Sequence, residues 1–157
     1  MSIIQYWSDK KSVKFFKNKK NDDFFLTEKF LFKKISFKFN SVLDIGCASG
    51  NIIKLLNTYS KNLDYTGIDI VQEQISIAKK KFPKFKFINS NLLKYKFLKT
   101  YELVNATGLI QHSNNYLKII DKMIDLSSKF IIFDVKIAEI NQKFDEKKDS
   151  FIKIGKN

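Results

Sequence analysis

The chain has 157 residues, of which 44% are hydrophobic and 15% aromatic, and its net charge at pH 7 is +13. This length fits one domain that buries a substantial core, and the composition excludes a disordered chain. The first residues lack the long apolar region of a secretion signal, and no apolar run approaches the roughly 20 residues that cross a bilayer. We therefore expect a cytoplasmic protein. With one cysteine, Cys47, and one histidine, the composition also excludes an internal disulfide and an ordinary zinc site.

The positive charge comes entirely from lysine, because all 29 basic residues are Lys. Arginine, whose planar group reads phosphates and guanines, is absent. The chain is also rich in Ile, Phe and Asn, a bias that AT-rich coding would produce whatever the function. We interpret the charge first as a solvated lysine surface and second as a nucleic-acid-binding patch. Some attraction to polyanions follows in either case.

The elements expected in chain order begin with a lysine-rich segment over residues 6–21, which forms one or two short helices or a mobile arm. Asp22 and Asp23 are expected to cap a helix over residues 22–35, with acids at its start and lysines near its end. Hydrophobic periodicity then predicts strands at 41–46, 63–70, 85–91, 101–108 and 129–137, and helices at 49–60, 72–82 and 114–128. The tail is charged and weakly patterned, and at most one further short strand is expected in it, over residues 150–155.

This alternation predicts an α/β fold, a doubly wound and mainly parallel sheet with right-handed crossovers. We expect a single domain over residues 1–157. It consists of an N-terminal arm or helices (1–21), a core (22–137) and a charged tail (138–157). In such a sheet, ligands lie at the carboxyl ends of the strands, where the strand order reverses.

The loop after the first predicted strand places an acid and small residues at every second position, in the order Asp44, Gly46, Ala48 and Gly50. Glycines there let the backbone approach a ligand closely. The spacing matches neither the dinucleotide fingerprint, nor the P-loop, nor the nucleophile elbow. It resembles the first motif of the class I S-adenosylmethionine-dependent methyltransferases, with Ala48 in place of the usual middle glycine. The resemblance covers roughly residues 22–137 and implies the strand order 3-2-1-4-5 and S-adenosylmethionine as cofactor.

The same resemblance implies roles for residues at the ends of the next two strands. Asp69, with Ile70 beside it, is implied to accept hydrogen bonds from both ribose hydroxyls. The alternative for Asp69 is a cap of the following helix. Asn91 is implied to accept from the adenine amino group, or is simply a turn residue. The backbone N–H of Leu92 is implied to meet the edge of the adenine ring.

After the fourth strand, Ala106 and Thr107 are implied to line the methionine part of the cofactor. The stretch "GLIQH" is similar to a Gly-hydrophobic-hydrophobic-x-His stretch that is common in the family. His112 at its end is a candidate general base, and the alternative is that it orients the loop before the next helix.

Asp44, Cys47 and Trp7 are three further candidates for the cofactor site, each with an alternative or minor role. Asp44 is expected either to position the methionine ammonium, through a water or a backbone contact, or to cap the loop. Cys47 is expected to be part of the cofactor loop, chiefly as a small residue. Trp7 lies in a segment that often folds over the cofactor in the family, so it is either part of a lid or an ordinary core contact.

The resemblance implies a methyltransferase that acts on an O or N of a small-molecule, glycan or lipid-precursor acceptor. Only 20 residues follow Ile137, fewer than the helix and antiparallel strand pair with which the family's sheet usually continues. A non-catalytic or partner-dependent subunit that binds the cofactor is therefore one alternative. An RNA methyltransferase is another, favoured by the positive charge and disfavoured by the absence of arginine. An exposed edge at the fifth strand would favour a homodimer or another partner subunit.

Overall fold

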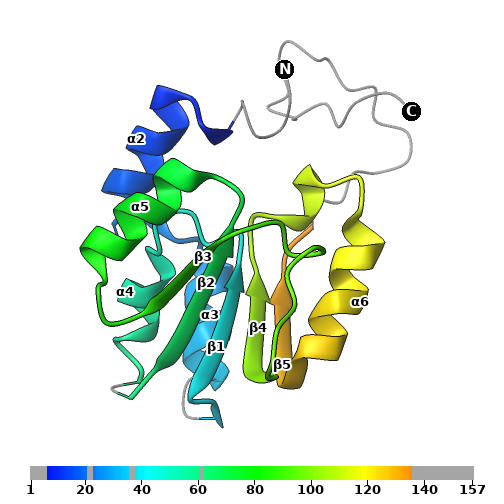
Figure 1. The fold of residues 1–157 in the computed structure, drawn as a ribbon. Helices are drawn as coiled ribbons and strands as arrows, with labels where there is room; N and C mark the ends of the chain where they lie inside the picture. The colour runs from blue at the N-terminus through cyan, green and yellow to red at the C-terminus, as the bar shows by residue number, and fades with distance from the viewer. Residues whose placement is uncertain (1–6, 21–22, 36–37, 61, 136–157) are drawn as a thin grey trace, which may run out of the picture.

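The structure is a computed structural model, and it describes residues 7–20, 23–35, 38–60 and 62–135. Within these ranges one parallel sheet has the strand order β3-β2-β1-β4-β5 (Figure 1). Its strands are β1 Ser41–Ile45, β2 Asp64–Asp69, β3 Lys86–Asn89, β4 Tyr101–Ala106 and β5 Ser127–Phe133. The helices are α2 Lys10–Asn18, α3 Leu26–Ile35, α4 Ile52–Leu56, α5 Gln72–Lys81 and α6 Tyr116–Leu126. The predicted fold class and strand order are confirmed.

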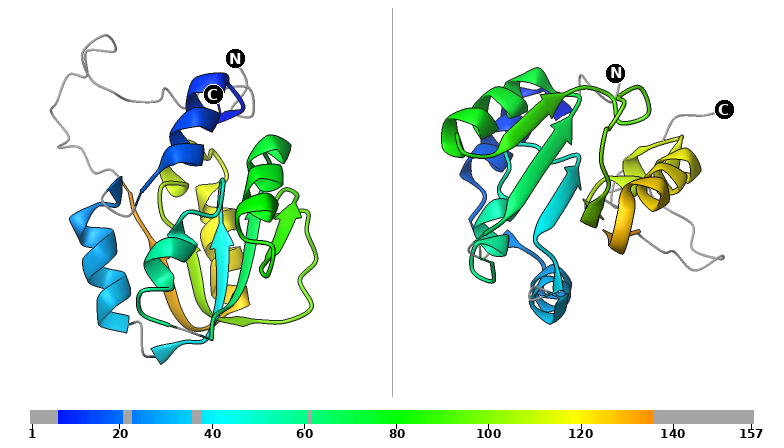
Figure 2. Two further views of the ribbon diagram at one scale, coloured as in Figure 1. Left: turned by 90° about the vertical axis from the view of Figure 1, so that its left-hand side faces the viewer. Right: turned by 60° about the horizontal axis from the view of Figure 1, so that its bottom comes forward.

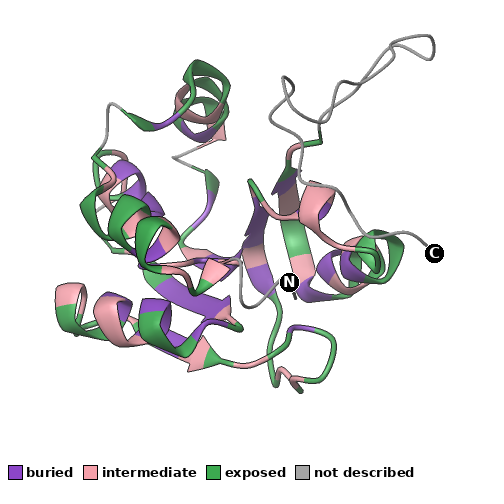
Figure 3. Ribbon diagram, turned by 90° about the horizontal axis from the view of Figure 1, so that it is seen from above, coloured by how far each residue is buried: buried purple, intermediate pink, exposed green. Residues whose placement is uncertain are grey.

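Helices cover both faces of the sheet, as two views of the ribbon show (Figure 2). Helices α3, α4 and α5 pack on one face around a core that includes Phe32. Helix α6 packs on the other face, where the core includes Met123. Successive side chains of a strand point to opposite faces, so Val42 belongs to the first core and Leu43 to the second. This burial on both faces is clearest in the central strands β1, β2 and β4, most of whose residues are buried, whereas the edge strands β3 and β5 are more exposed (Figure 3).

The start of α3 differs from the sequence-based prediction. The helix begins at Leu26, and the carboxylate of Glu28 accepts a hydrogen bond from the N–H of Phe25 at 2.7 Å. Asp23 does not cap this helix, because its carboxylate accepts from the N–H of Lys20 at 2.6 Å. The predicted role of Asp23 is therefore wrong, and Asp22 lies outside the described residues.

The start of β5 also differs, since residues 127 and 128 were expected to end the preceding helix. Helix α6 ends at Leu126, and the next residue is already extended, with φ −96° and ψ 132°. The hydroxyl of Ser127 donates to the carbonyl of Phe130 at 2.9 Å, and that of Ser128 donates to the carbonyl of Tyr101 at 3.2 Å. The first bond joins Ser127 to a later residue of β5, and the second joins Ser128 to the neighbouring strand β4.

Part of the expected N-terminal arm forms the helix α2. Asp9 caps it, because its carboxylate accepts from the N–H groups of Lys11 at 2.7 Å and Ser12 at 3.0 Å. The buried side of the helix is made by Val13. The prediction of a short helix in this segment is confirmed.

Backbone carbonyls at the end of α2 are held by side chains of other elements. The accepting carbonyls belong to Phe16, Lys17 and Lys19, and the donors are Ser49, Asn51, Lys54 and Lys81. Cations suit this place because the carboxyl end of a helix carries partial negative charge. These bonds attach α2 to the start of α4 and the end of α5.

Two predictions fall partly or wholly outside the described ranges. The charged tail and the possible strand at 150–155 lie there, so they stay predictions. Strand β5 ends the sheet formed by the described strands, and pairing of another chain with it also stays a prediction.

Among the helices described, none has the length and apolar character that crossing a membrane requires.

Candidate functional site

The loop after β1 forms a tight bend in which every second residue has a positive φ. The values are 72° at Gly46, 44° at Ala48 and 74° at Gly50. This left-handed conformation suits glycine and costs alanine about 1 kcal/mol. The N–H groups of Gly46 and Cys47 donate to the carbonyl of Ile68 at 2.8 and 3.3 Å, which joins the bend to β2. The backbone conformation thus requires the spacing of small residues seen in the sequence.

The side chain of Cys47 points into the protein beneath the bend. It is buried against β2, where a Cβ added at Gly67 would lie 2.7 Å from its sulfur. Burial raises the pKa of the Cys47 thiol well above its ordinary value, so the thiol stays protonated. Any contribution of Cys47 to ligand binding therefore comes from its backbone.

The carboxylate of Asp69 faces the bend from the end of β2. One oxygen accepts from the N–H of Ala48 at 2.9 Å, and the other accepts from the N–H of Val71 at 2.8 Å. Burial raises the pKa of Asp69, while these two hydrogen bonds act in the opposite direction. A carboxylate has about four acceptor positions, so about two remain for a ligand. The N-cap residue of α5 is Val71, so Asp69 does not cap this helix, although it bonds to the residue just before it. Asp69 lies on the bend, with Ile70 exposed beside it.

Asp44 lies in the interior and joins three strands. Its carboxylate accepts from the hydroxyl of Tyr65 at 2.6 Å and from the amide of Asn105 at 2.7 Å. Burial raises the pKa of Asp44 to about 6, against the effect of these two donors. Both oxygens are engaged by β2 and β4 rather than by the loop, so the capping interpretation is wrong. The contact with a methionine ammonium stays a prediction.

Asn91 and Leu92 follow β3 and differ in exposure. The side-chain oxygen of Asn91 accepts from the N–H of Leu93 at 2.9 Å, which makes Asn91 a turn residue. Leu92 is buried in the core on the α6 side of the sheet. Their proposed contacts with adenine stay predictions. These contacts would use the second acceptor position of the Asn91 side-chain oxygen and the backbone N–H of Leu92.

The end of β4 provides open space next to the bend. Ala106 is buried, and the hydroxyl of Thr107 accepts from the amide of Asn105 at 3.3 Å. Gly108 has φ 74°, and a Cβ added there would meet no atom within 4 Å. The loop therefore leaves room on the side where the sequence placed the methionine part of a cofactor.

His112 ends a 3-10 turn, Ile110–His112, and contacts the N-terminal segment. The rings of Trp7 and His112 meet edge-on with centroids 5.0 Å apart, and Trp7 also lies 5.9 Å from the ring of Phe16. Trp7 therefore connects α2 with the loop after β4. The contact supports the interpretation that His112 holds this loop in place, and the general-base role stays a prediction.

Parallel strands end on the same edge of the sheet, and this edge collects the candidate residues. The register pairs Ile45 with Ile68, and Asp69 with Asn89, so the bend, the carboxylate of Asp69 and the turn after β3 are neighbours.

Sequence reasoning missed Tyr65 and Asn105. The available signal was the acid within an apolar strand, since a buried carboxylate needs donors from adjacent strands. In the described part of the chain, no three His, Cys, Asp or Glu side chains gather as a metal site would require.

The fold and the bend define the class of protein. The sequence model of a family described as "Methyltransferase domain" matches residues 42–129, which is more than half of the chain. The chain belongs to this family.

Individual proteins similar to the chain are also methyltransferases by name. The probable (S)-tetrahydroprotoberberine N-methyltransferase 2 of Papaver bracteatum is 28% identical over 88 residues, which are 53% of this chain and 25% of that protein. The plantazolicin methyltransferase BpumL, solved in complex with SAH, is 25% identical with a TM-score of 0.64, over 83% of this chain and 55% of that chain. The plantazolicin methyltransferase BamL is 28% identical with a TM-score of 0.62, over 79% and 50%. The chain thus spans a quarter of the length of the curated relative and about half of these solved chains.

Proposed function

We propose that the chain binds S-adenosylmethionine at the carboxyl ends of β1, β2 and β4 and transfers its methyl group to an O or N atom of a small-molecule, glycan or lipid-precursor acceptor. The observation that carries this proposal is the carboxylate of Asp69, which lies on the bend between Gly46 and Gly50 and keeps free acceptor positions. Membership of the methyltransferase family supports it. So do the structures of BpumL and BamL in complex with SAH, the product that S-adenosylmethionine leaves after methyl transfer.

The residues of the edge fit the parts of this cofactor by their chemistry. The ribose has two hydroxyl donors, and Asp69 has about two free acceptor positions. The open space beside Gly108 suits the methionine part, which side chains would otherwise obstruct. Asn91 and the N–H of Leu92 are assigned to the adenine.

The chain contributes binding and alignment to the reaction. When bound, S-adenosylmethionine supplies a methyl group on a positively charged sulfur, which a nucleophile attacks in line. Holding the two reactants in that geometry lowers the barrier without any covalent bond to the protein. A neutral amine acceptor needs no proton removed before the attack. A hydroxyl acceptor does, and His112 is the residue assigned to take that proton.

The acceptor class rests on the names of similar proteins. The relative from Papaver bracteatum is named as the N-methyltransferase of a small molecule. A sugar N-methyltransferase, KedS8 from a Streptoalloteichus species, shares the fold with 14% identity and a TM-score of 0.61, over 73% of this chain and 49% of that chain. These names favour a nitrogen acceptor on a small molecule over an oxygen acceptor.

Isothermal titration of the full chain with S-adenosylmethionine and SAH tests the proposal. Asp69→Ala removes hydrogen bonds to a charged group, and we expect its affinity to fall by about 1–3 kcal/mol. Asp64→Ala is the matched control, because Asp64 is an exposed carboxylate at the opposite end of the same strand. Absence of binding to the unchanged protein at near-millimolar cofactor would overturn the proposal. Equal losses for both variants would mean that Asp69 is not the ribose ligand.

A further inference from the structure

Two segments of the chain carry most of its net positive charge. Residues 7–20 contain six lysines and one acid, and residues 72–86 contain five lysines and one acid, so the two segments carry +9 of the net +13. Residues 114–135, which include α6, contain three lysines and three acids. The net charge is therefore unevenly distributed along the chain, whatever the origin of its lysine content.

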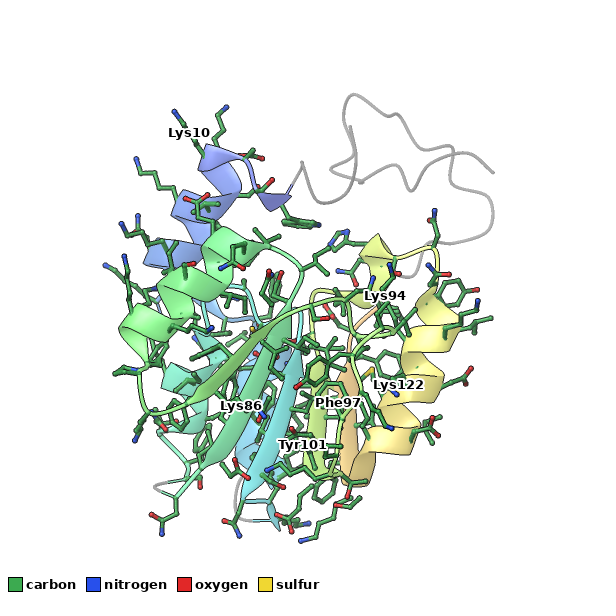
Figure 4. All side chains as sticks on the ribbon, in the orientation of Figure 1. Lys10, Lys86, Lys94, Phe97, Tyr101 and Lys122 are labelled. Carbon is green, nitrogen blue, oxygen red and sulfur yellow. The ribbon has the colours of Figure 1, made fainter. Side chains whose placement is uncertain are left out.

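The two lysine-rich segments lie side by side in the fold. Helix α2 packs against α5, as the views of the ribbon also show (Figures 1 and 2). Burial and, to a smaller extent, the nearby ammonium groups of Lys54 and Lys17 lower the pKa of Lys81. We call the exposed lysines of these two neighbouring helices the α2–α5 lysine surface, namely Lys10, Lys11, Lys14, Lys17, Lys79 and Lys80. Lys10 extends outward from α2 in Figure 4.

A hollow of about 450 Å³ lies next to this surface and contains an aromatic ring. Its lining residues are Lys11, Lys14, Phe15, Asn18, Lys19 and Asp23. The side chain of Phe15 is 59% exposed, and its ring is held edge-on by Phe16 with centroids 5.1 Å apart. The hollow therefore presents a fixed apolar ring between ammonium groups.

We propose that the α2–α5 lysine surface binds a single-stranded polynucleotide, with phosphates on the lysines and one base stacked on Phe15. Lysine neutralises phosphates without reading base edges, and an exposed aromatic ring stacks with any base. The absence of arginine from the chain is therefore compatible with binding that ignores sequence. Asp23, which lines the hollow, repels phosphate, so a base rather than a phosphate occupies that side. The proposal goes beyond the proposed function and does not require the cofactor.

The shape and charge of the surface favour a polynucleotide over a membrane. A helix that lies in a bilayer surface presents a continuous apolar face to the lipid. Helix α2 instead presents four exposed lysines and one exposed aromatic residue, and the aromatic residue lines a hollow.

Fluorescence anisotropy of the full chain with a labelled oligouridylate of about 12 nucleotides tests the proposal, since single-strand sites span about 4–16 nucleotides. Lys11→Gln/Lys14→Gln should reduce the slope of log K against log salt by about 1.4, or about 0.7 for each lost phosphate contact. Lys96→Gln/Lys118→Gln removes the same charge from exposed lysines elsewhere and should leave the slope unchanged. Phe15→Ala should weaken binding roughly 5- to 100-fold. Phe30→Ala, at an exposed phenylalanine of α3, is its control.

Three results would overturn the proposal. Polyphosphate that competes as well as oligouridylate, with no effect of Phe15→Ala, would show attraction to polyanions in general. Equal effects of the two double lysine variants on the salt dependence would show that the α2–α5 lysine surface is not the binding site. Cosedimentation with phosphatidylserine vesicles, competing with oligouridylate and weakened by Phe15→Ala, would identify a membrane surface instead. An oligothymidylate arm distinguishes RNA from DNA. All of these titrations are made without the cofactor, so their outcomes do not depend on whether the chain binds it.

Discussion

The buried carboxylate of Asp44 makes a specific prediction about stability and pH. In the folded chain its pKa is raised from 3.8 to about 6. The folded state therefore holds the proton more tightly than the unfolded state does. The stability that Asp44 contributes is fully present below about pH 4 and is lost as the pH rises through about 6. A rise of about two pKa units corresponds to about 3 kcal/mol of unfolding free energy.

Asp44→Asn removes this titration and keeps the size of the side chain. The unfolding free energy of the unchanged protein, minus that of the variant, should therefore fall by about 2–3 kcal/mol between about pH 4 and about pH 7. Urea denaturation followed by far-ultraviolet circular dichroism at several pH values measures this difference. Carboxylates shared by the two proteins, such as Glu102 with its lowered pKa, cancel in the subtraction.

The matched control is Asp64→Asn, which removes an exposed carboxylate from the same sheet. Its ion pair with Lys99 is at the surface, so the variant should change stability by no more than about 1 kcal/mol. A difference between the unchanged protein and Asp44→Asn that stays flat across this pH range would refute the reasoning. It would mean that Asp44 is hydrated or paired in a way that cancels its burial.

Three further substitutions test the packing around the site. Tyr65→Phe removes a donor from the buried Asp44 and should lower the unfolding free energy by about 1.5–3 kcal/mol, whereas Tyr116→Phe, at a half-exposed tyrosine, should have little effect in the same denaturation assay. Ala48→Gly relieves the positive φ and should raise the melting temperature through a gain of up to about 1 kcal/mol; a lower melting temperature would contradict this. Gln74→Met replaces a buried amide whose nitrogen and oxygen have no partner in the described structure, and should raise the unfolding free energy by about 1 kcal/mol. A loss of that size in denaturant titration would instead reveal a partner for Gln74.

The sequence predicts the sheet well because burial leaves a clear local pattern. The central strands β1, β2 and β4 are buried along most of their length, and α6 buries Ile119, Met123 and Leu126 at helical spacing, as its apolar positions indicated. The boundaries are less clear where polar residues fit either element. Ser127 and Ser128 continue the polar pattern of a helix end, yet their hydroxyls bond to strand carbonyls.

The site was predictable where a role follows from position along the chain. Asp69 stands at the end of a buried strand, and parallel pairing brings it next to the bend. Contacts between distant segments left no such signal. The edge-on contact of Trp7 with His112 depends on where the whole of α2 docks. The same holds for the donors of Asp44, whose identities follow from strand register rather than from local sequence.

The attachment of α2 has a consequence for how the bend and the N-terminal helix affect each other. Ser49 and Asn51 stand on either side of Gly50, and both donate to the carbonyl of Phe16. A ligand that displaces this turn must therefore carry the last turn of the N-terminal helix with it. Occupancy at one place then alters affinity at the other, and thermodynamic reciprocity makes the two effects equal in size.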